Sequence, residues 1–245
     1  MADLLEPTAF AERNHFWFHG FRASFTPVLQ QIAGGRRDLR LLDCGCGTGY
    51  NLQHLLRPYG RAFGFDLSED SMRRGREAHL PIARGNMHHI PFRSKTFDVA
   101  TSFDVMQSVP DDRSAVREMA RVVKPGGYVV LNVTALEVLR GDHSDVWAEL
   151  RRYTPRTARQ LLADAGLQPV RIAFLFASIL PMVLGVRLAQ RLSRRFRHPM
   201  RDEDLQVPAA PVNAVLARLV RGEAALARCV PMPCGSSLMI VARKP

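Results

Sequence analysis

The residues best suited to chemistry lie in one short stretch, residues 41–50, with the sequence LLDCGCGTGY. An apolar run ends in the acid Asp43, and glycines follow at alternate positions, Gly45, Gly47 and Gly49. Such glycines allow backbone conformations that other residues avoid, and they let a ligand approach the main chain closely. The pattern predicts a buried strand, a glycine-rich turn and a helix, which together form a crevice for an adenosine-bearing ligand.

The spacing of the glycines argues against a nicotinamide or flavin dinucleotide as this ligand. The dinucleotide fingerprint has glycines at the first, third and sixth positions, where the helix begins at the pyrophosphate. Counted from Gly45, the sixth position holds Tyr50, whose side chain would crowd that group.

A second acid lies where nucleotide-binding sheets carry their ribose ligand. Residues 61–66 (RAFGFD) predict a strand that ends in Asp66, seventeen residues after Gly49. In nucleotide-binding folds a carboxylate at about this separation holds the ribose hydroxyls. Ser68 is the better N-cap for the following helix, which leaves Asp66 available to a ligand.

These motifs and three later ones resemble the class I S-adenosylmethionine-dependent methyltransferases, in particular their small-molecule, type 11-like branch. The later motifs are residues 85–92 (GNMHHIPF), 96–100 (TFDVA) and 124–131 (KPGGYVVL). The resemblance covers residues 39–135. It implies a methyltransferase whose cofactor is S-adenosylmethionine.

The resemblance also implies roles for individual residues. Asp43 would help to hold the cofactor's ammonium group, and Asp66 its ribose. Asn86 stands where the family usually has an aspartate that accepts the adenine amino group, and its carbonyl can accept the same bond without charge. Each of three residues could instead have only a structural role. Asp43 could form the turn, Asp66 could cap the next helix, and Met87 could belong to the core. The expected cofactor residues are Asp43, Gly45, Cys46, Gly47, Gly49, Asp66, Leu67, Asn86, Met87 and Phe103.

On the acceptor side, few groups could remove a proton. Methyl transfer from a sulfonium mainly requires alignment, exclusion of water and, for a hydroxyl acceptor, a base. Asp104 follows the predicted fourth strand and His143 the fifth, and these are the catalytic candidates, although His143 could also be a surface residue. Related sequences often have Glu-His where this chain has Gln107 and Ser108, and an Asp where it has Ser144.

An aromatic-rich segment, residues 14–22 (NHFWFHGFR), predicts an N-terminal helix in which Trp17 and Phe21 share a face. This helix either packs on the sheet or closes over the site as a lid, and it can do both. His15, Trp17 and His19 are its substrate-side candidates. The segment resembles a branch of bacterial methyltransferases often linked with lipid-borne glycans or polyketide-type products, with further matches at residues 151–154 and 233–238.

The order of predicted elements indicates an α/β, Rossmann-like, doubly wound sheet of seven strands. The resemblance implies that the last strand, residues 236–243, inserts antiparallel between the fifth, 128–133, and the sixth, 167–175. A single methyltransferase domain over residues 1–245 is expected. Its parts are an N-terminal helical lid (1–35), a cofactor-binding core (36–175), a helical insertion between strands six and seven (176–234) and a final strand (235–245).

The composition agrees with a soluble enzyme, because 245 residues with 47% hydrophobic content can form one large core. No signal peptide is visible at the N-terminus, so a cytoplasmic location is expected. The spacing of the four cysteines fits neither a common zinc site nor a secreted disulfide framework, so we expect no metal.

The net charge of +11 is concentrated in the second part of the chain. Residues 1–140 hold eighteen Lys or Arg against fifteen Asp or Glu, and residues 141–245 hold sixteen against eight. The uncharged run 172–186 is too short to span a bilayer, which takes about twenty residues, and an arginine-rich stretch follows. The pattern predicts either a core strand with a helix over the site, or contact with an anionic membrane surface.

Nucleic acid is a less favoured partner, because residues 101–104 (TSFD) lack the Asn-Pro-Pro-Tyr-type run of nucleic-acid amino methyltransferases. The sequence therefore predicts methyl transfer to a small-molecule or lipid-linked acceptor at an oxygen atom. Two alternatives stay open, an RNA methyltransferase and a cofactor-binding protein without turnover that serves as a partner or scaffold. Gln107, Ser108 and Ser144 favour the latter, and the oligomeric state is not predicted.

Overall fold

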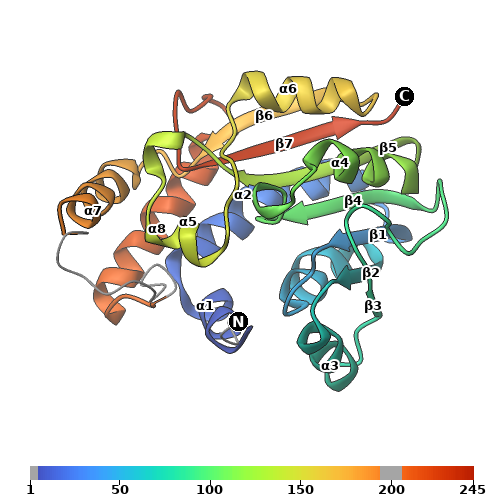
Figure 1. Ribbon diagram of the computed structural model, residues 1–245, viewed down its shortest axis with the longest axis horizontal. Helices are drawn as coiled ribbons and strands as arrows, with labels where there is room; N and C mark the ends of the chain where they lie inside the picture. The colour runs from blue at the N-terminus through green and yellow to red at the C-terminus, as the bar shows by residue number, and fades with distance from the viewer. Residues whose placement is uncertain (1–4, 194–205) are drawn as a thin grey trace.

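A computed structural model describes residues 5–193 and 206–245 of the chain. Its centre is a seven-stranded sheet with the order β3-β2-β1-β4-β5-β7-β6 (Figure 1). The strands are β1 (Leu39–Cys44), β2 (Gly60–Asp66), β3 (Ile82–Arg84), β4 (Phe97–Phe103), β5 (Val123–Thr134), β6 (Gln168–Leu175) and β7 (Ser237–Arg243). Because β7 pairs antiparallel with β5 and β6 while the pairs among β1–β5 are parallel, the predicted sheet is confirmed.

Helices lie on both faces of this sheet. They are α1 (Leu5–Asn14), α2 (Phe16–Ala33), α3 (Glu69–Glu77), α4 (Asp112–Val122), α5 (Asp142–Val146), α6 (Pro155–Asp164), α7 (Leu180–Ser193) and α8 (Ala210–Leu226). Their beginnings follow the predicted capping chemistry, since Ser68 accepts a hydrogen bond from the Asp70 amide and Thr154 caps α6. Helices α7 and α8 form the predicted insertion between β6 and β7.

Two segments differ from the prediction. The turns after the glycine loop are a π-helix, Leu52–Leu56, and a 3-10 helix, Arg57–Tyr59, in place of a regular helix. Pro58 lacks an amide hydrogen and its ring crowds the preceding turn, which prevents a long α-helix there. The fifth strand begins at Val123 instead of residue 128, because Val123 already pairs with Phe97 of β4 before the register shifts and Tyr128 pairs with Val99.

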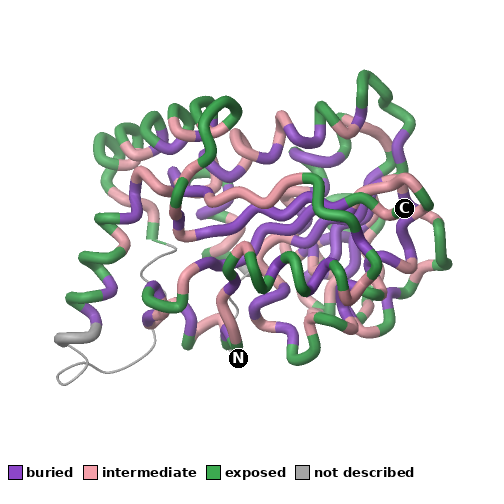
Figure 2. The backbone as a smooth tube through the Cα atoms, turned by 90° about the horizontal axis from the view of Figure 1, so that it is seen from above, coloured by how far each residue is buried: buried purple, intermediate pink, exposed green. Residues whose placement is uncertain are grey.

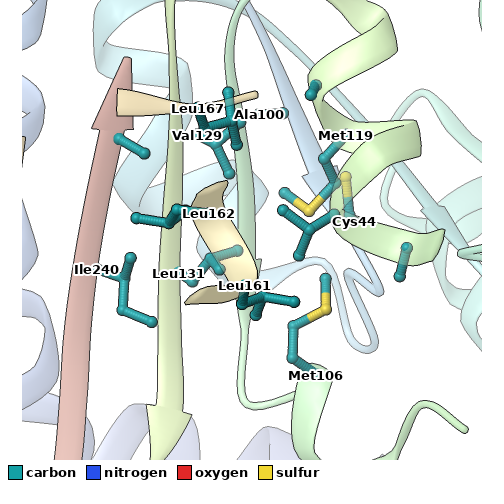
Figure 3. Close-up of a cluster of buried hydrophobic side chains, with 14 of the residues drawn as sticks. Cys44, Ala100, Met106, Met119, Val129, Leu131, Leu161, Leu162, Leu167 and Ile240 are labelled. Carbon is teal, nitrogen blue, oxygen red and sulfur yellow. The ribbon is translucent and has the colours of Figure 1, made fainter. Parts of the chain in front are cut away.

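Two layers of buried side chains hold the sheet in place. The cluster under α4 and α6 contains the core residues that Figure 3 labels, among them Met119, Leu131 and Ile240. On the opposite face, Phe21 and Phe25 of α2 are almost completely buried. Figure 2 shows the strands as a buried centre within exposed segments. The core therefore fixes the carboxyl ends of β1, β2, β4 and β5 at one edge, where the predicted site residues begin.

Candidate functional site

The glycine loop connects the end of β1 to the π-helix. Gly45, Gly47 and Gly49 have φ angles of 76°, 49° and 77°, in the left-handed region that favours glycine. A Cβ would lie 2.6 Å from Val105 Cγ2 at Gly45 and 2.6 Å from Leu80 Cδ1 at Gly49, whereas nothing lies within 4 Å at Gly47. The outer two glycines therefore permit close packing, and the middle one faces open space that a ligand can enter.

Two predicted acids flank this loop. Asp43, at the end of β1, is 2% exposed and accepts a hydrogen bond from Thr101 Oγ1 at 2.8 Å. Burial, together with the charges of Glu12 and Asp66, raises the pKa of Asp43 to about 7, although the Thr101 hydrogen bond opposes the shift. Asp66, the last residue of β2, accepts hydrogen bonds from the amides of Gly47 at 2.8 Å and Ser68 at 2.9 Å. The glycine loop and both acids thus lie together.

The residues expected at the adenine have different surroundings. Leu67 directly follows Asp66 and is 65% exposed, so its side chain is accessible to a ligand. Met87 is buried in the core. Asn86 is exposed, and its Oδ1 accepts a hydrogen bond from the His88 amide at 2.9 Å, which leaves a second lone pair on that oxygen.

Two other cofactor candidates have close packing contacts. Phe103 packs edge to face on Phe21 and Phe25, with ring centroids 5.0 and 5.1 Å apart. Cys46 is buried against Gly64, where a Cβ would lie 2.7 Å from its sulfur. Packing alone accounts for these two side chains.

Helix α1 adds an acid that the sequence analysis missed. Glu12 is 6% exposed and accepts a hydrogen bond from Thr48 Oγ1 in the glycine loop. Burial raises the pKa of Glu12 to about 7, although the Thr48 hydrogen bond and nearby arginines oppose the shift. Arg22 donates to the carbonyl oxygen of Glu12 at 2.8 Å and lies 5.1 Å from the centre of the Tyr50 ring. No motif marks Glu12, because its partner lies 36 residues away.

The N-terminal candidates mainly have packing contacts. His15 caps α2, with its Nδ1 accepting a hydrogen bond from the Trp17 amide at 3.1 Å. Trp17 stacks on Phe21 and Phe176, with centroids 5.5 and 5.0 Å apart. The pKa of His19 is lowered by burial and by a neighbouring arginine. These contacts are those of a helix that packs on the sheet.

The catalytic candidates lie together at the ends of β4 and β5. Asp104 has a φ of 57°, and Asn132 Nδ2 of β5 donates to both of its carboxylate oxygens at 2.9 Å. Burial raises the pKa of Asp104 to about 7, against hydrogen bonds from Asn132 and Gln107 and the charge of His143. Gln107, which the sequence analysis treated as a departure from the family, is therefore part of this cluster.

A buried ion pair supports the segment around His143. Arg152 Nη2 donates to Glu149 Oε2 at 2.9 Å and to Ser144 Oγ at 3.1 Å. Ser108 Oγ donates to the carbonyl oxygen of Trp147 at 2.8 Å. Ser108 and Ser144, the other two departures from the family, thus attach the α5 segment to the rest of the site.

Known proteins match this chain over its core. Residues 42–131 match the family described as "Methyltransferase domain". An uncharacterised 37.1 kDa protein in transposon TN4556 of Streptomyces fradiae is 29% identical over 181 residues, which are 68% of this chain and 52% of that protein. Demethylmenaquinone methyltransferase of Anoxybacillus flavithermus is 32% identical over 130 residues, 49% of this chain and 55% of that one. The chain spans about half the length of these relatives.

A solved structure shares the fold over most of the chain. Geranyl diphosphate C-methyltransferase of Streptomyces coelicolor A3(2) aligns with a TM-score of 0.56 and 19% identity, over 90% of this chain and 76% of that one. The sheet order, the family match and this structural similarity all indicate the same methyltransferase fold. Residues 42–131 therefore match a methyltransferase domain, and the chain has the fold of the class I S-adenosylmethionine-dependent methyltransferases.

Proposed function

We propose that this protein transfers a methyl group from S-adenosylmethionine to an oxygen atom of a small-molecule or lipid-linked acceptor. The observation that carries the proposal is the open space at Gly47, with Glu12, Asp43 and Asp66 around it, at the sheet edge that also carries Asp104. S-adenosylmethionine has a positive ammonium and a positive sulfonium, which suit a loop surrounded by carboxylates. The same carboxylates would repel the pyrophosphate of a dinucleotide.

Each cofactor residue has a proposed contact with this ligand. Asp43 binds the ammonium group and Asp66 the ribose hydroxyls. The exposed Leu67 covers one face of the adenine, and Asn86 accepts its amino group with the second lone pair of Oδ1. The relatives named for demethylmenaquinone and geranyl diphosphate support a small-molecule acceptor.

Asp104 is the proposed base. When bound, S-adenosylmethionine supplies an activated methyl group. Asp104 would take the proton of the acceptor hydroxyl as its oxygen accepts this methyl group. A carboxylate with a pKa of about 7 is well matched to this task near neutral pH. Asn132 and Gln107 hold Asp104 in position, and His143 compensates its charge.

We further propose that the protein is cytoplasmic and meets a lipid-linked acceptor at an anionic membrane surface. The excess of basic residues in the second part of the chain supports this contact. Four of the arginines that contribute to this excess lie outside the described residues: Arg194, Arg195, Arg197 and Arg201. Among the helices that the structure describes, none has the length and apolar character needed to cross a bilayer.

Calorimetry tests the cofactor directly. We expect micromolar binding of S-adenosylmethionine and of S-adenosylhomocysteine, and no detectable heat with NAD. Gly47→Val should abolish binding, because its side chain enters the open space at a φ that valine avoids. Tight NAD binding without heat from S-adenosylmethionine would contradict the proposal.

The role of Asp66 has a separate test. Asp66→Ala removes a carboxylate whose charge-assisted hydrogen bonds to ribose are each worth about 1.5–3 kcal/mol, so cofactor affinity should fall at least about tenfold. Asp70→Ala on α3, where the side chain is 43% exposed and paired with Arg73, is the matched control and should retain the affinity. Unchanged affinity in a folded Asp66→Ala protein would leave Asp66 with a structural role only.

A further inference from the structure

Helix α7 (Leu180–Ser193) buries two polar residues among those whose side chains the structure describes. Arg187 and Gln190 are only 7% and 6% exposed, and Arg187 Nη1 donates to Gln190 Oε1 at 2.8 Å. A Cβ at Gly141 would lie 2.5 Å from Arg187 Cδ and 2.7 Å from Gln190 Oε1, so both side chains face the segment that leads to His143. A surface helix ordinarily buries its apolar side and exposes its polar side. Over residues 181–190, α7 instead buries its two polar side chains and exposes most of its apolar ones.

The outer side of α7 carries no charge between residues 181 and 190. Every exposed position there is apolar or glycine: Pro181, Met182, Leu184, Gly185, Val186, Leu188 and Ala189. The four large side chains in this set are between 39% and 58% exposed. Scattered apolar residues are common on protein surfaces, but a continuous apolar helix face indicates a binding surface.

Helix α8 has apolar residues on two opposite sides. One side, with Ala217, Val220 and Ala224, is buried. It faces α2, where a Cβ at Gly20 would lie 2.7 Å from Val220. The other side carries four large residues at helical spacing, between 45% and 61% exposed: Val212, Val215, Leu219 and Leu226.

The two helices lie at the same end of the molecule (Figure 1). The Glu223 carboxylate of α8 accepts hydrogen bonds from the amides of Ala177 at 2.9 Å and Ser178 at 2.7 Å, just before α7. Asn213 of α8 accepts a hydrogen bond from the Phe16 amide at 2.9 Å. These hydrogen bonds connect α8 to the segment before α7 and to the start of α2.

We propose that these two sides form one surface that docks on an anionic phospholipid bilayer. This α7–α8 surface consists of Met182, Leu184, Val186, Leu188, Val212, Val215, Leu219 and Leu226. The inference rests on the proposed membrane contact and assigns it to specific residues, but it does not require turnover. Apolar side chains of an interfacial helix enter the boundary between headgroups and acyl chains by about 5–10 Å.

Charge favours a bilayer over a second copy of the chain as the occupant. Arg218 of α8 is exposed one turn after Val215, and residues 141–245 carry twice as many basic as acidic residues. Basic residues are attracted to the negative surface of an anionic membrane. A second copy would instead bring the same excess of positive charge to the interface.

Vesicle co-sedimentation at low salt tests the surface. The wild-type protein should bind vesicles of phosphatidylcholine and phosphatidylglycerol much more strongly than vesicles of phosphatidylcholine alone, and salt should weaken the binding. The double variants Leu184→Asp/Leu188→Asp and Val215→Asp/Leu219→Asp should each lower the bound fraction at least about tenfold, since they place charge in the interface. Val170→Asp, at a 56% exposed position of β6, is the matched control and should bind like the wild type.

Three results would overturn the inference. They are a wild-type protein that ignores anionic vesicles, double variants that bind as well as the wild type, and a wild-type dimer that the double variants convert to monomers in sedimentation without lipid. Circular dichroism and thermal unfolding establish that the variants fold. Calorimetry with S-adenosylmethionine tests the proposed function separately, so a protein that binds the cofactor but not vesicles would contradict only the docking surface.

Discussion

Replacement of Asp104 by asparagine should lower the rate of methyl transfer by about 10²–10⁴-fold, the usual contribution of a positioned general base. Asparagine keeps an oxygen that can accept a hydrogen bond from Asn132, but it cannot take a proton. It also tolerates the φ of 57° at this position better than alanine does, so the backbone should be undisturbed. Cofactor affinity should not change.

The measurement is transfer of a tritiated methyl group from S-adenosylmethionine to an extract of the organism that encodes the chain. Because the pKa of Asp104 is about 7, the wild-type rate should rise with pH through about 7, as the carboxylate loses its proton. Asp104→Asn should lose this dependence. Asp98→Asn, near the other end of β4, is the matched control. A variant with the wild-type rate and pH profile would show that Asp104 is not the base.

Replacement of Asp43 by asparagine should stabilise the ligand-free protein at pH 8 while it weakens cofactor binding. The pKa of Asp43 is about 7 in the folded protein, above the ordinary value of 3.8. The stability that this group contributes is complete below about pH 4 and is lost as the pH rises through about 7. At pH 8 the buried charge therefore costs at most about 4 kcal/mol, at 1.36 kcal/mol per pKa unit.

Asparagine removes this cost, because it stays neutral and its Oδ1 can still accept the hydrogen bond from Thr101. It also loses the charge that holds the ammonium group, so we expect affinity for S-adenosylmethionine to fall at least about tenfold. Thermal unfolding at pH 5 and pH 8 and calorimetry measure both effects. Asp38→Asn is the control, since Arg36 lowers the pKa of that exposed carboxyl and no stabilisation is expected. A less stable Asp43→Asn protein with unchanged affinity would contradict the prediction.

The cofactor half of the site could be predicted because its signals are local. A strand that ends in Asp43, alternate glycines that need positive φ, and an acid at the end of the next strand are properties of short segments. Parallel strands in one sheet then bring Asp43 and Asp66 to the same edge. Asp104 and His143 could be selected for the same reason, since each follows a strand.

The side chains that contact these site residues could not be predicted from the sequence, because they come from segments far away along the chain. Glu12 contacts Thr48 only after α1 packs against the glycine loop, and Asn132 reaches Asp104 only through the pairing of β4 with β5. From the sequence, Gln107 was only a replacement for a residue that related sequences often have there. In the structure its side chain forms a hydrogen bond with Asp104.

The sequence by itself determined the order of elements, the glycine loop and the uncharged run of residues 172–186. Only the tertiary structure decided which side of each element is buried. In α7 the polar Arg187 and Gln190 are buried, whereas Met182, Leu184, Val186 and Leu188 are exposed. The physical reason is that composition and helical spacing define the sides of a helix, whereas burial depends on the elements that pack against it.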